Sequence, residues 1–432
     1  MSWAASGGMA LTGHRDKAPA LSPAPAFELL GAASRALSEV TGQAGNEVVI
    51  DPAATVFGRA GWSGRGRDGR QSVGGTSRIL RTADGWCAVT LSRPDDHAAI
   101  PAILGAAPKS DAWTALATAA RLWSAKDLVD RAQLLGVPAA VVPPRSSVPS
   151  RPRFRAAVAP GAECSSALRA DMPLGPHIEV PWRTSRIAAV DPAASLRGCL
   201  VVDLSALWAG PLCARLLGSA GARVVKVESV HRPDAFRAGN PELYRWLHDG
   251  HEFRCVDFRS AAGRAELAAL IAAADVVIEA SRPRALAQLG LAPADVAHRP
   301  GRVWLSLTGY GRGEPMRVAF GDDAAAAGGL VGWCGDEPVF CGDAIADPLS
   351  GICAALAVAT AVRAGGGVLI DLSMRATAAA FAAAPEVAHG PHRVVPDGKE
   401  WVVDCAAHGL TQRVLPPPIP DRYPLPPSGI RC

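Results

Sequence analysis

The stretch from 199 to 228 constrains the fold of this chain most strongly. C-L-V-V-D-L-S (199–205) has the continuous apolar character of a buried strand, and A-G-P-L-C-A-R-L-L-G-S-A-G (209–221) that of a helix with a glycine stop. A second strand, A-R-V-V-K-V-E (222–228), follows at once. A strand–helix–strand unit of this kind places its two strands parallel in one sheet. The pattern therefore predicts an α/β fold with an open, Rossmann-like parallel sheet.

Further alternation downstream extends this sheet. Strands are predicted at 253–258, 275–279, 301–311 and 367–373, and helices at 241–247, 261–273, 282–289, 348–362 and 374–384. Asp203 and Glu228 fall at carboxyl ends of strands, where α/β folds bind ligands. The first helix begins W-A-G-P, so the G-x-G-x-x-G dinucleotide fingerprint is missing. Gly210 permits close backbone approach to a ligand, or it simply punctuates the strand-to-helix turn.

The rest of the chain divides into regions of different composition. We expect a disordered N-terminus (1–25), a small α+β domain (26–143), a Pro/Arg-rich linker (144–194), the parallel-sheet domain (195–384) and a peripheral tail (385–432). The small domain rests on helical patterns at 28–40, 95–104, 113–123 and 125–135, a strand signal at 46–50 and a hairpin at Asp84-Gly85. Its Gly- and Arg-dense segment, 58–75, is interpreted either as a polar loop or as a loop that contacts anions.

Charge and cysteine usage exclude several classes of partner. The net charge of +4 and the absence of basic runs with interleaved aromatic residues argue against nucleic acid. Ten scattered cysteines with no C-x-x-C pair indicate no zinc or other metal site, and a reducing, cytoplasmic setting. We find no signal-peptide pattern, and the longest apolar run (348–362) is 15 residues, too short to span a membrane.

One stretch, 340–355, carries the strongest chemical signal. Its polar turn holds Asp343 and Asp347, and Asp347-Pro348 opens the apolar helix. We predict that Asp347 is the N-cap and Pro348 the first helical residue. The helix dipole would favour the ionised carboxylate, which is what nucleophilic catalysis by Asp requires. From the local sequence alone, the alternative is that Asp347 only caps its helix, and we expect Asp343 to be a turn residue.

Five segments appear in a familiar order along 197–383. They read V-V-D-L-S-A-L-W-A-G-P, G-A-R-V-V-K-V-E, A-D-V-V-I-E-A-S-R-P-x-x-L-x-x-L-G-L, L-T-G-Y-G and G-D-A-I-A-D-P-L-S-G. The chain therefore resembles the family III CoA-transferases (CaiB/BaiF family), which include formyl-CoA and carnitine CoA-transferases. The resemblance implies that CoA moves from an acyl-CoA thioester to a carboxylic acid. It places the family's catalytic aspartate on Asp347, through covalent aspartyl intermediates, and implies no permanently bound cofactor, since coenzyme A is substrate and product.

The resemblance also implies a set of CoA contacts. The family often has a basic residue directly after Glu228, where this chain has Ser229, with Arg232 close by. Gln288 and Gly250-His251 replace other residues usual in the family. The contacts carry over onto Trp208, Ala209, Ala280, Ser281, Arg282, Gly309 and Tyr310, with Arg232 as the nearby basic residue.

The order of domains departs from the family pattern. The stretch that resembles the family's small domain precedes the parallel sheet here, so the chain looks circularly permuted or like two fused partial copies. The glycine-rich loop that closes over the catalytic aspartate would then be Gly74-Gly75. Members of the family form interlocked homodimers, so one chain's small domain could complete the site of the other.

Two alternatives remain at this stage. An α-methylacyl-CoA racemase-like enzyme needs a His in a G-H-D pattern, but this chain has Gly321-Asp322-Asp323 there. A non-catalytic CoA-binding or assembly homologue would account for the altered basic positions and domain order. The retained Asp347 argues against that second alternative.

Overall fold

The computed structural model describes all residues except 23–24, 109, 146–179, 385–390 and 421–432. In the described part, a seven-stranded sheet of order β4-β12-β9-β8-β5-β6-β7 forms the centre of the molecule. β5 to β9 and β12 run parallel, whereas β4 pairs antiparallel with β12. This confirms the predicted α/β fold and parallel sheet. The strands are β4 (Trp182–Arg186), β5 (Leu200–Asp203), β6 (Arg223–Ser229), β7 (Glu252–Val256), β8 (Val276–Glu279), β9 (Val303–Thr308) and β12 (Val368–Ser373).

The strand order reverses between β5 and β8. From β5 the chain builds outward to β6 and β7, and from β8 it builds in the other direction to β9 and β12. In open parallel sheets the crevice at such a reversal, at the carboxyl ends of the strands, is the usual ligand site. The loops after β5 and β8 therefore hold the position where a ligand is expected.

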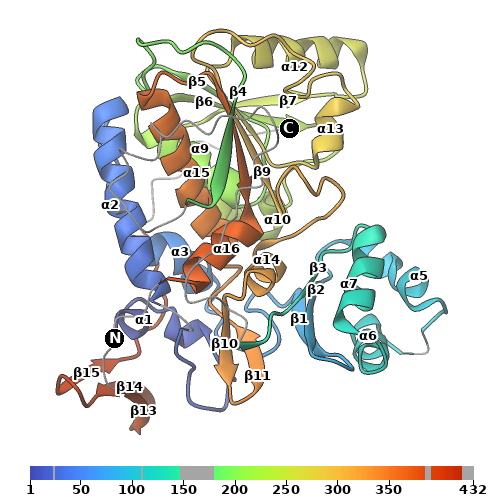
Figure 1. The fold of residues 1–432 in the computed structure, drawn as a ribbon, viewed down its shortest axis with the longest axis vertical. Coiled ribbons are helices and arrows are strands. Elements are labelled where there is room, and N and C mark those ends of the chain that lie inside the picture. Colours follow the sequence, from blue (N-terminus) through green and yellow to red (C-terminus); the bar gives the residue numbers. More distant parts are fainter. Residues whose placement is uncertain (23–24, 109, 146–179, 385–390, 421–432) are drawn as a thin grey trace.

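Both faces of the sheet are covered by helices. One face packs on α15 (Ala346–Arg363), α9 (Ala209–Ser219) and α2 (Ala26–Ala44), while α12 (Ala261–Ala273) covers the other (Figure 1). Neighbouring residues of β5 divide between the two cores, because successive side chains in a strand point to opposite faces. Shorter helices are α10 (Phe236–Gly239), α11 (Pro241–Leu247), α13 (Pro283–Ala287), α14 (Gly321–Ala327) and α16 (Met374–Ala382).

The helix α15 is the centre of the larger core. Among the described helices it alone has the length and mean hydropathy of a membrane-spanning segment, but 89% of that window is buried inside the protein. It touches α9 closely at Gly351, where an added Cβ would lie 2.7 Å from the Ala209 carbonyl oxygen. The apolar run in the sequence is therefore a core helix.

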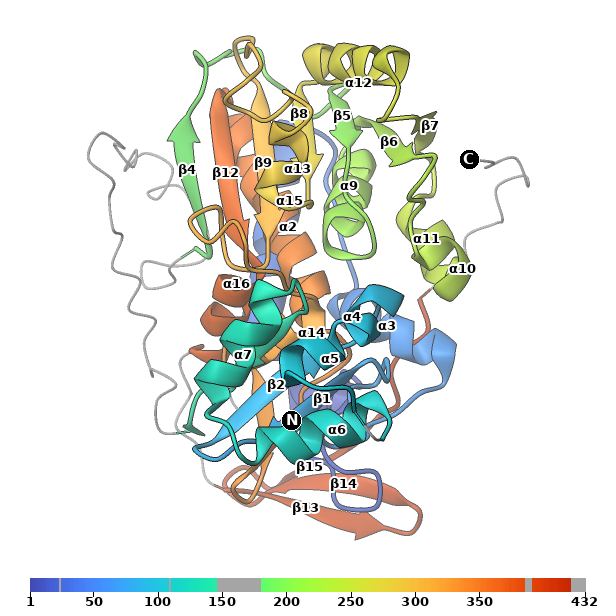
Figure 2. The ribbon, with the colours of Figure 1, turned by 90° about the vertical axis from the view of Figure 1, so that its right-hand side faces the viewer.

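The small domain lies against the carboxyl end of the main sheet (Figures 1 and 2). The Asp84-Gly85 hairpin is confirmed, since β1 (Ser77–Arg81) pairs antiparallel with β2 (Trp86–Thr90), which pairs in turn with β3 (Ala139–Val141). This sheet has its own apolar core with four helices. They are α4 (Pro94–Ala98), α5 (Ile100–Leu104), α6 (Ala112–Ala120) and α7 (Ala125–Leu134).

The N-terminal boundaries differ from the prediction. The described part of 1–25 is not disordered: α1 (Ser2–Ala5) and a 3₁₀ turn (Met9–Leu11) bury apolar side chains in the main core. The segment 46–50 forms no strand. The Gly/Arg-dense stretch is partly helical, since α3 (Pro52–Ser63) extends into it. α2 and α3 pack with the main sheet, so 26–63 belongs to the large domain in space.

The predicted linker and tail are also more structured than expected. β4 lies within 144–194 and forms an edge of the main sheet, while 146–179 lies outside the described residues. The tail carries β13 (His392–Asp397), β14 (Glu400–Cys405) and β15 (Leu410–Arg413), and the N–H of Leu415 donates to the Ala4 carbonyl oxygen at 2.9 Å. The hairpin of β10 (Val331–Cys334) and β11 (Glu337–Phe340) leads into α15 and was not predicted.

The described cysteines depart in part from an all-thiol chain. Cys87, Cys213 and Cys353 are among seven free thiols, six of which are buried. Cys255 is disulfide-bonded. The expectation of a uniformly reduced chain is therefore wrong for Cys255.

Candidate active site

Asp347 sits in the first turn of α15, two positions further into the helix than predicted. The helix begins at Ala346, so its N-cap is Ile345 and the Asp347 side chain makes no cap hydrogen bond. The chain enters the helix through Ala344, which has a positive φ of 43°, and the Asp347 N–H donates to the Ala344 carbonyl oxygen at 2.9 Å. Pro348 still fits, because N–H groups of the first turn have no intrahelical acceptor. Asp347 is thus held by the helix without being used as a cap.

Three further carboxylates surround this position. Asp322 and Asp323 begin α14, and Asp343 lies in the turn before α15; all three are buried. Asp322 accepts from the Ser77 hydroxyl and from the Ala344 N–H, each at 2.9 Å. Asp323 accepts from the Thr90 hydroxyl at 2.9 Å. Hydroxyls of β1 and β2 therefore anchor the small domain to the acidic cluster.

One cation, Arg59 of α3, enters this cluster. Its Nε donates to Asp343 Oδ2 at 2.7 Å and its Nη2 donates to Asp343 Oδ1, so the pair is bidentate. Its guanidinium also lies over the Trp208 ring, 4.8 Å from the centroid. Burial alone would lower the pKa of Arg59, but the neighbouring Asp343 raises it above its ordinary value, so the group stays charged.

The pKa of Asp347 is raised to about 7. Burial is the largest cause of this rise, and the negative charges of Asp322 and Asp343 add to it. The positive charge of Arg59 and a hydrogen bond from the Gly321 N–H lower the pKa of Asp347. Burial likewise raises the pKa of Asp323 to about 8. The helix dipole was expected to favour the ionised form of Asp347, but desolvation outweighs any such effect and raises the pKa.

The backbone at Gly321 comes unusually close to Asp347. A Cβ added there would lie 2.6 Å from Asp347 Oδ2 and 2.3 Å from the Ala344 carbonyl oxygen. Any larger residue would displace the carboxylate. The first glycine of Gly321-Asp322-Asp323 therefore serves the site by giving its N–H access to Asp347.

The loop that carries Gly74 and Gly75 lies beside the same cluster. Gly75 has φ of 81° and its N–H donates to the Ser72 carbonyl oxygen at 2.8 Å, which closes a tight turn. A Cβ at Gly74 would lie 3.5 Å from Arg59 Nη2. Ser72 also hydrogen bonds to Asp322. The structure thus brings Gly74 and Gly75 close to the carboxylates around Asp347, within one chain.

The predicted CoA contacts lie at one edge of the sheet. Trp208 and Ala209 follow β5, Arg232 follows β6, and the segment 280–282 follows β8. Trp208 is buried at the start of α9, with an unpartnered Nε1. Ala280 and Ser281 are half-buried, and Arg232 is exposed. The structure connects Trp208 to the carboxylate cluster through Arg59.

Arg282 stands in a group of arginines. Burial and the charges of Arg284, Arg93 and Arg232, in that order, lower the pKa of Arg282. Its Nη2 lies 3.0 Å from the Cβ position of Gly136, whose carbonyl oxygen accepts from Arg93 Nη2 at 2.9 Å. Arg93 opens α4 of the small domain, so both domains contribute to this positive surface. Clustered guanidinium groups are suited to phosphate oxygens.

Gly309 and Tyr310 follow β9 and face the small domain. Gly309 packs on Ala319, where a Cβ would lie 2.7 Å from the Ala319 Cβ. The Tyr310 hydroxyl donates to the Ala139 carbonyl oxygen of β3 at 3.3 Å, and Arg317 lies over its ring. Tyr310, Arg317 and Arg375 line a cavity of about 460 Å³ between the domains.

Asp203 and Glu228 serve the interior of the protein. The buried Lys226 lies 3.6 Å from Asp203, and Glu228 accepts from the Tyr244 hydroxyl at 2.6 Å and from Arg237 Nε at 3.0 Å. These contacts fill a buried network behind the carboxyl ends of β5 and β6. The positions were predicted correctly, but both Glu228 oxygens accept hydrogen bonds from the protein, and Asp203 Oδ2 faces Lys226 without a hydrogen bond.

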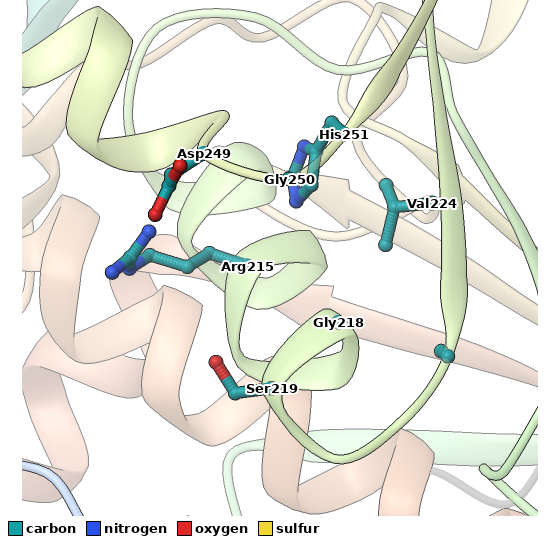
Figure 3. A pocket seen from close by; sticks show the side chains of 8 residues that line it. Arg215, Gly218, Ser219, Val224, Asp249, Gly250 and His251 are labelled. Carbon is teal, nitrogen blue, oxygen red and sulfur yellow. The ribbon is translucent and has the colours of Figure 1, made fainter. Parts of the chain in front are cut away.

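A second cavity, of about 270 Å³, lies elsewhere on the fold (Figure 3). It is lined by the carboxyl end of α9, including Arg215 and Ser219, by Val224 at the start of β6, and by Asp249 and His251 before β7. These positions lie at the amino ends of the strands, opposite the edge that holds Trp208 and Arg282. Among the described residues, no group of three His, Cys, Asp or Glu side chains is arranged to hold a metal ion.

Fold and site define an α/β protein with a mainly parallel sheet and a carboxylate cluster at the starts of α14 and α15. Residues 196–405 match the family model of CoA-transferase family III. The matched part of the chain carries Asp347.

Individual relatives match over a similar region. An acyl-CoA transferase of Fusarium pseudograminearum is 33% identical over 220 residues, covering 44% of this chain and 48% of that protein. A succinyl-CoA–D-citramalate CoA-transferase of Chloroflexus aurantiacus is 30% identical over 200 residues, covering 42% and 50%. The chain thus spans about half the length of these curated relatives. A crystal structure of a CAIB/BAIF family protein from Brucella suis aligns with a TM-score of 0.43 and 26% identity, over 49% of this chain and 65% of that one.

The raised pKa of Asp347 predicts a pH-dependent cost to stability. Its folded-state pKa of about 7 exceeds the ordinary value of 3.8, so stability is present in full at low pH and is lost as pH rises through 7. Asp347→Asn should therefore raise the melting temperature, by more at pH 8 than at pH 5. Calorimetry at both pH values tests this, with Asp336→Asn on the exposed β10–β11 turn as control. An equal effect at the two pH values would contradict it.

Proposed function

We propose that this protein is a CoA-transferase that moves CoA from an acyl-CoA thioester to a carboxylic acid, with Asp347 as nucleophile. The observation that carries the proposal is the environment of Asp347. Its side chain is half-buried, accepts a hydrogen bond from the Gly321 N–H and lies near one cation, Arg59, which favours the ionised carboxylate. A carboxylate released from water but still reachable is a competent nucleophile for a thioester. The match of 196–405 to CoA-transferase family III and the CoA-transferases among the relatives support the same reaction.

The chemistry proceeds through two anhydrides. The Asp347 carboxylate attacks the thioester carbonyl, the C–S bond breaks, and CoA leaves as thiolate. The thiolate then attacks the Asp347 carbonyl carbon and releases the donor acid, leaving an aspartyl-CoA thioester. The acceptor carboxylate attacks this thioester in turn, and the returning thiolate takes the acceptor acyl group, which restores Asp347. An N–H such as that of Gly321 is a suitable donor to the oxyanions that develop at this carboxyl group.

We assign CoA to the carboxyl edge of the sheet. CoA would contact Trp208, Ala209, Ala280, Ser281, Gly309 and Tyr310. Its phosphates would contact Arg232 and Arg282. The arginine group around Arg282 supports this assignment, because a CoA diphosphate and ribose phosphate need several fixed cations. The positive surface also argues against a homologue that has lost CoA binding.

The racemase alternative is weaker. Such an enzyme would need a second acid–base group opposite Asp347, and the family's His position is taken here by Asp322. Both Asp322 oxygens accept hydrogen bonds from Ser77 and the Ala344 N–H. A carboxylate held in this way is poorly placed to take a proton from a substrate carbon.

The first test of the function is the loss of transfer on removal of the nucleophile. Asp347→Ala should lower CoA exchange between an acyl-CoA and an acid by roughly 10³-fold or more. In the wild type, kcat/KM should rise about tenfold per pH unit below pH 7 and level off above it, because the ionised form reacts and its pKa is about 7. Asp336→Ala, on an exposed turn, is the matched control. Full activity of Asp347→Ala would exclude this mechanism.

We further propose that each site is completed within one chain. Arg59 and the Ser72–Gly75 turn meet Asp343 and Asp322 of their own chain. The homodimer implied by the family resemblance would then contain two independent sites.

Mixing two variants that are both impaired at pH 6, and assaying them at that pH, separates the two arrangements. Co-expressed Asp347→Ala and Arg59→Gln chains should give mixed dimers with no more activity than the sum of the separate variants. In the isolated mixed dimers, recovery of about half of wild-type activity would show that one chain's N-terminal segment serves the other chain's Asp347, and would refute this arrangement. Tagging the two chains differently and isolating the mixed species provides the measurement.

A further inference from the structure

We propose that Arg59 is a positioning residue for the reaction of Asp347, and that its clamp on Asp343 supplies the positive charge which keeps Asp347 reactive inside the carboxylate cluster. This inference rests on the proposed function of Asp347. It adds a role for a residue 288 positions away in the sequence, which lies outside the part of the chain matched by the family model.

Arg59 sets the balance of charge around Asp347. The groups that act on Asp347 are Arg59 from α3, Asp322 from α14 and Asp343 from the turn before α15, together with the Gly321 N–H. Arg59 is the one cation among them, and it faces three carboxylates. Without Arg59, only a single backbone N–H would stabilise the negative charge on Asp347. The carboxylate would then bind a proton and lose its nucleophilic form.

The guanidinium group of Arg59 is held rigidly by its neighbours. Nε and Nη2 are fixed by the two oxygens of Asp343, and one face of the guanidinium is covered by the Trp208 ring. The side chain of Arg59 is 15% exposed and that of Asp343 is 2% exposed. A bidentate pair in such surroundings has little freedom, so the charge stays at a fixed position relative to Asp347. Asp343 is therefore more than the turn residue expected from the sequence.

The two partners of this ion pair have opposite effects on Asp347. Arg59 favours its ionised form, whereas Asp343 disfavours it by like-charge repulsion. A purely structural ion pair would respond alike to the loss of either partner. An electrostatic role predicts shifts of opposite sign, and this difference is what the experiment measures.

The experiment compares pH profiles of kcat/KM for CoA transfer in three variants. Arg59→Gln should move the acidic limb upward by about one pH unit or more, and Arg59→Lys should restore most of the wild-type profile. Asp343→Asn should move the limb to lower pH, because it removes a negative charge near Asp347. The charge of Arg59 is then no longer offset by Asp343. Arg70→Gln is the matched control, since Arg70 also pairs with a carboxylate, Glu337, and lies over a tryptophan, Trp86, without acting on Asp347.

A second readout does not need activity. The ¹³C carboxyl resonance of Asp347, assigned by its loss in Asp347→Asn, titrates with the same expected shifts in each variant. Circular dichroism confirms that each variant is folded, and if Arg59→Gln is not, Arg59→Lys and Asp343→Asn still carry the test. The inference would be overturned if the acidic limb of kcat/KM and the titration midpoint of Asp347 did not change in these variants. It would also be overturned if both moved in the same direction in Arg59→Gln and Asp343→Asn. If Asp347→Ala remains fully active, it is the proposed function that fails.

Discussion

The ion pair between Arg59 and Asp343 is the interaction on which the site depends. Four buried or half-buried carboxylates lie together at the starts of α14 and α15, and burial raises the pKa of Asp347, Asp322 and Asp323. Such a cluster is costly to form unless a cation and hydrogen-bond donors enter it. Arg59 provides the cation, Ser77 and Thr90 provide hydroxyl donors, and the N–H groups of Gly321 and Ala344 complete the set. All of these donors come from segments that the carboxylates bring together in space.

The same contacts explain how segments on both sides of the linker build one site. The parallel sheet presents its loops at one edge, and the small domain lies at that edge through the bonds of β1 and β2 to α14. The N-terminal helix α3 reaches the start of α15 from the other direction because α2 and α3 belong to the core of the large domain. The sequence segments before and after the linker are therefore interleaved, and both the acidic cluster and the arginine group around Arg282 take residues from each.

The sequence predicted helix bounds well where local capping residues set them. It could not predict contacts between residues far apart in the chain. The helices at 241–247 and 261–273 were predicted to the residue, because Asn240 and Ser260 cap them with side-chain acceptors. The Asp-Pro rule is satisfied at Asp51-Pro52, where Asp51 accepts from two N–H groups. It misplaced Asp347 by two positions, because the turn at Ala344 starts the helix earlier. Arg59 was hidden in a glycine-rich stretch, and no local pattern could pair it with Asp343 across 284 residues. Asp322 and Asp323 entered the sequence analysis only because they stand where a racemase would have its G-H-D histidine.

The central claim is that Asp347 becomes covalently bonded during transfer, and oxygen labelling tests it most directly. The acceptor acid is supplied with ¹⁸O in both carboxylate oxygens, and the peptide that contains Asp347 is analysed by mass spectrometry after turnover. Attack on an aspartyl-CoA thioester leaves one acceptor oxygen on Asp347, so the account predicts a gain of label there that requires both substrates and is absent from peptides that carry other carboxylates. Turnover without label on Asp347 would contradict it.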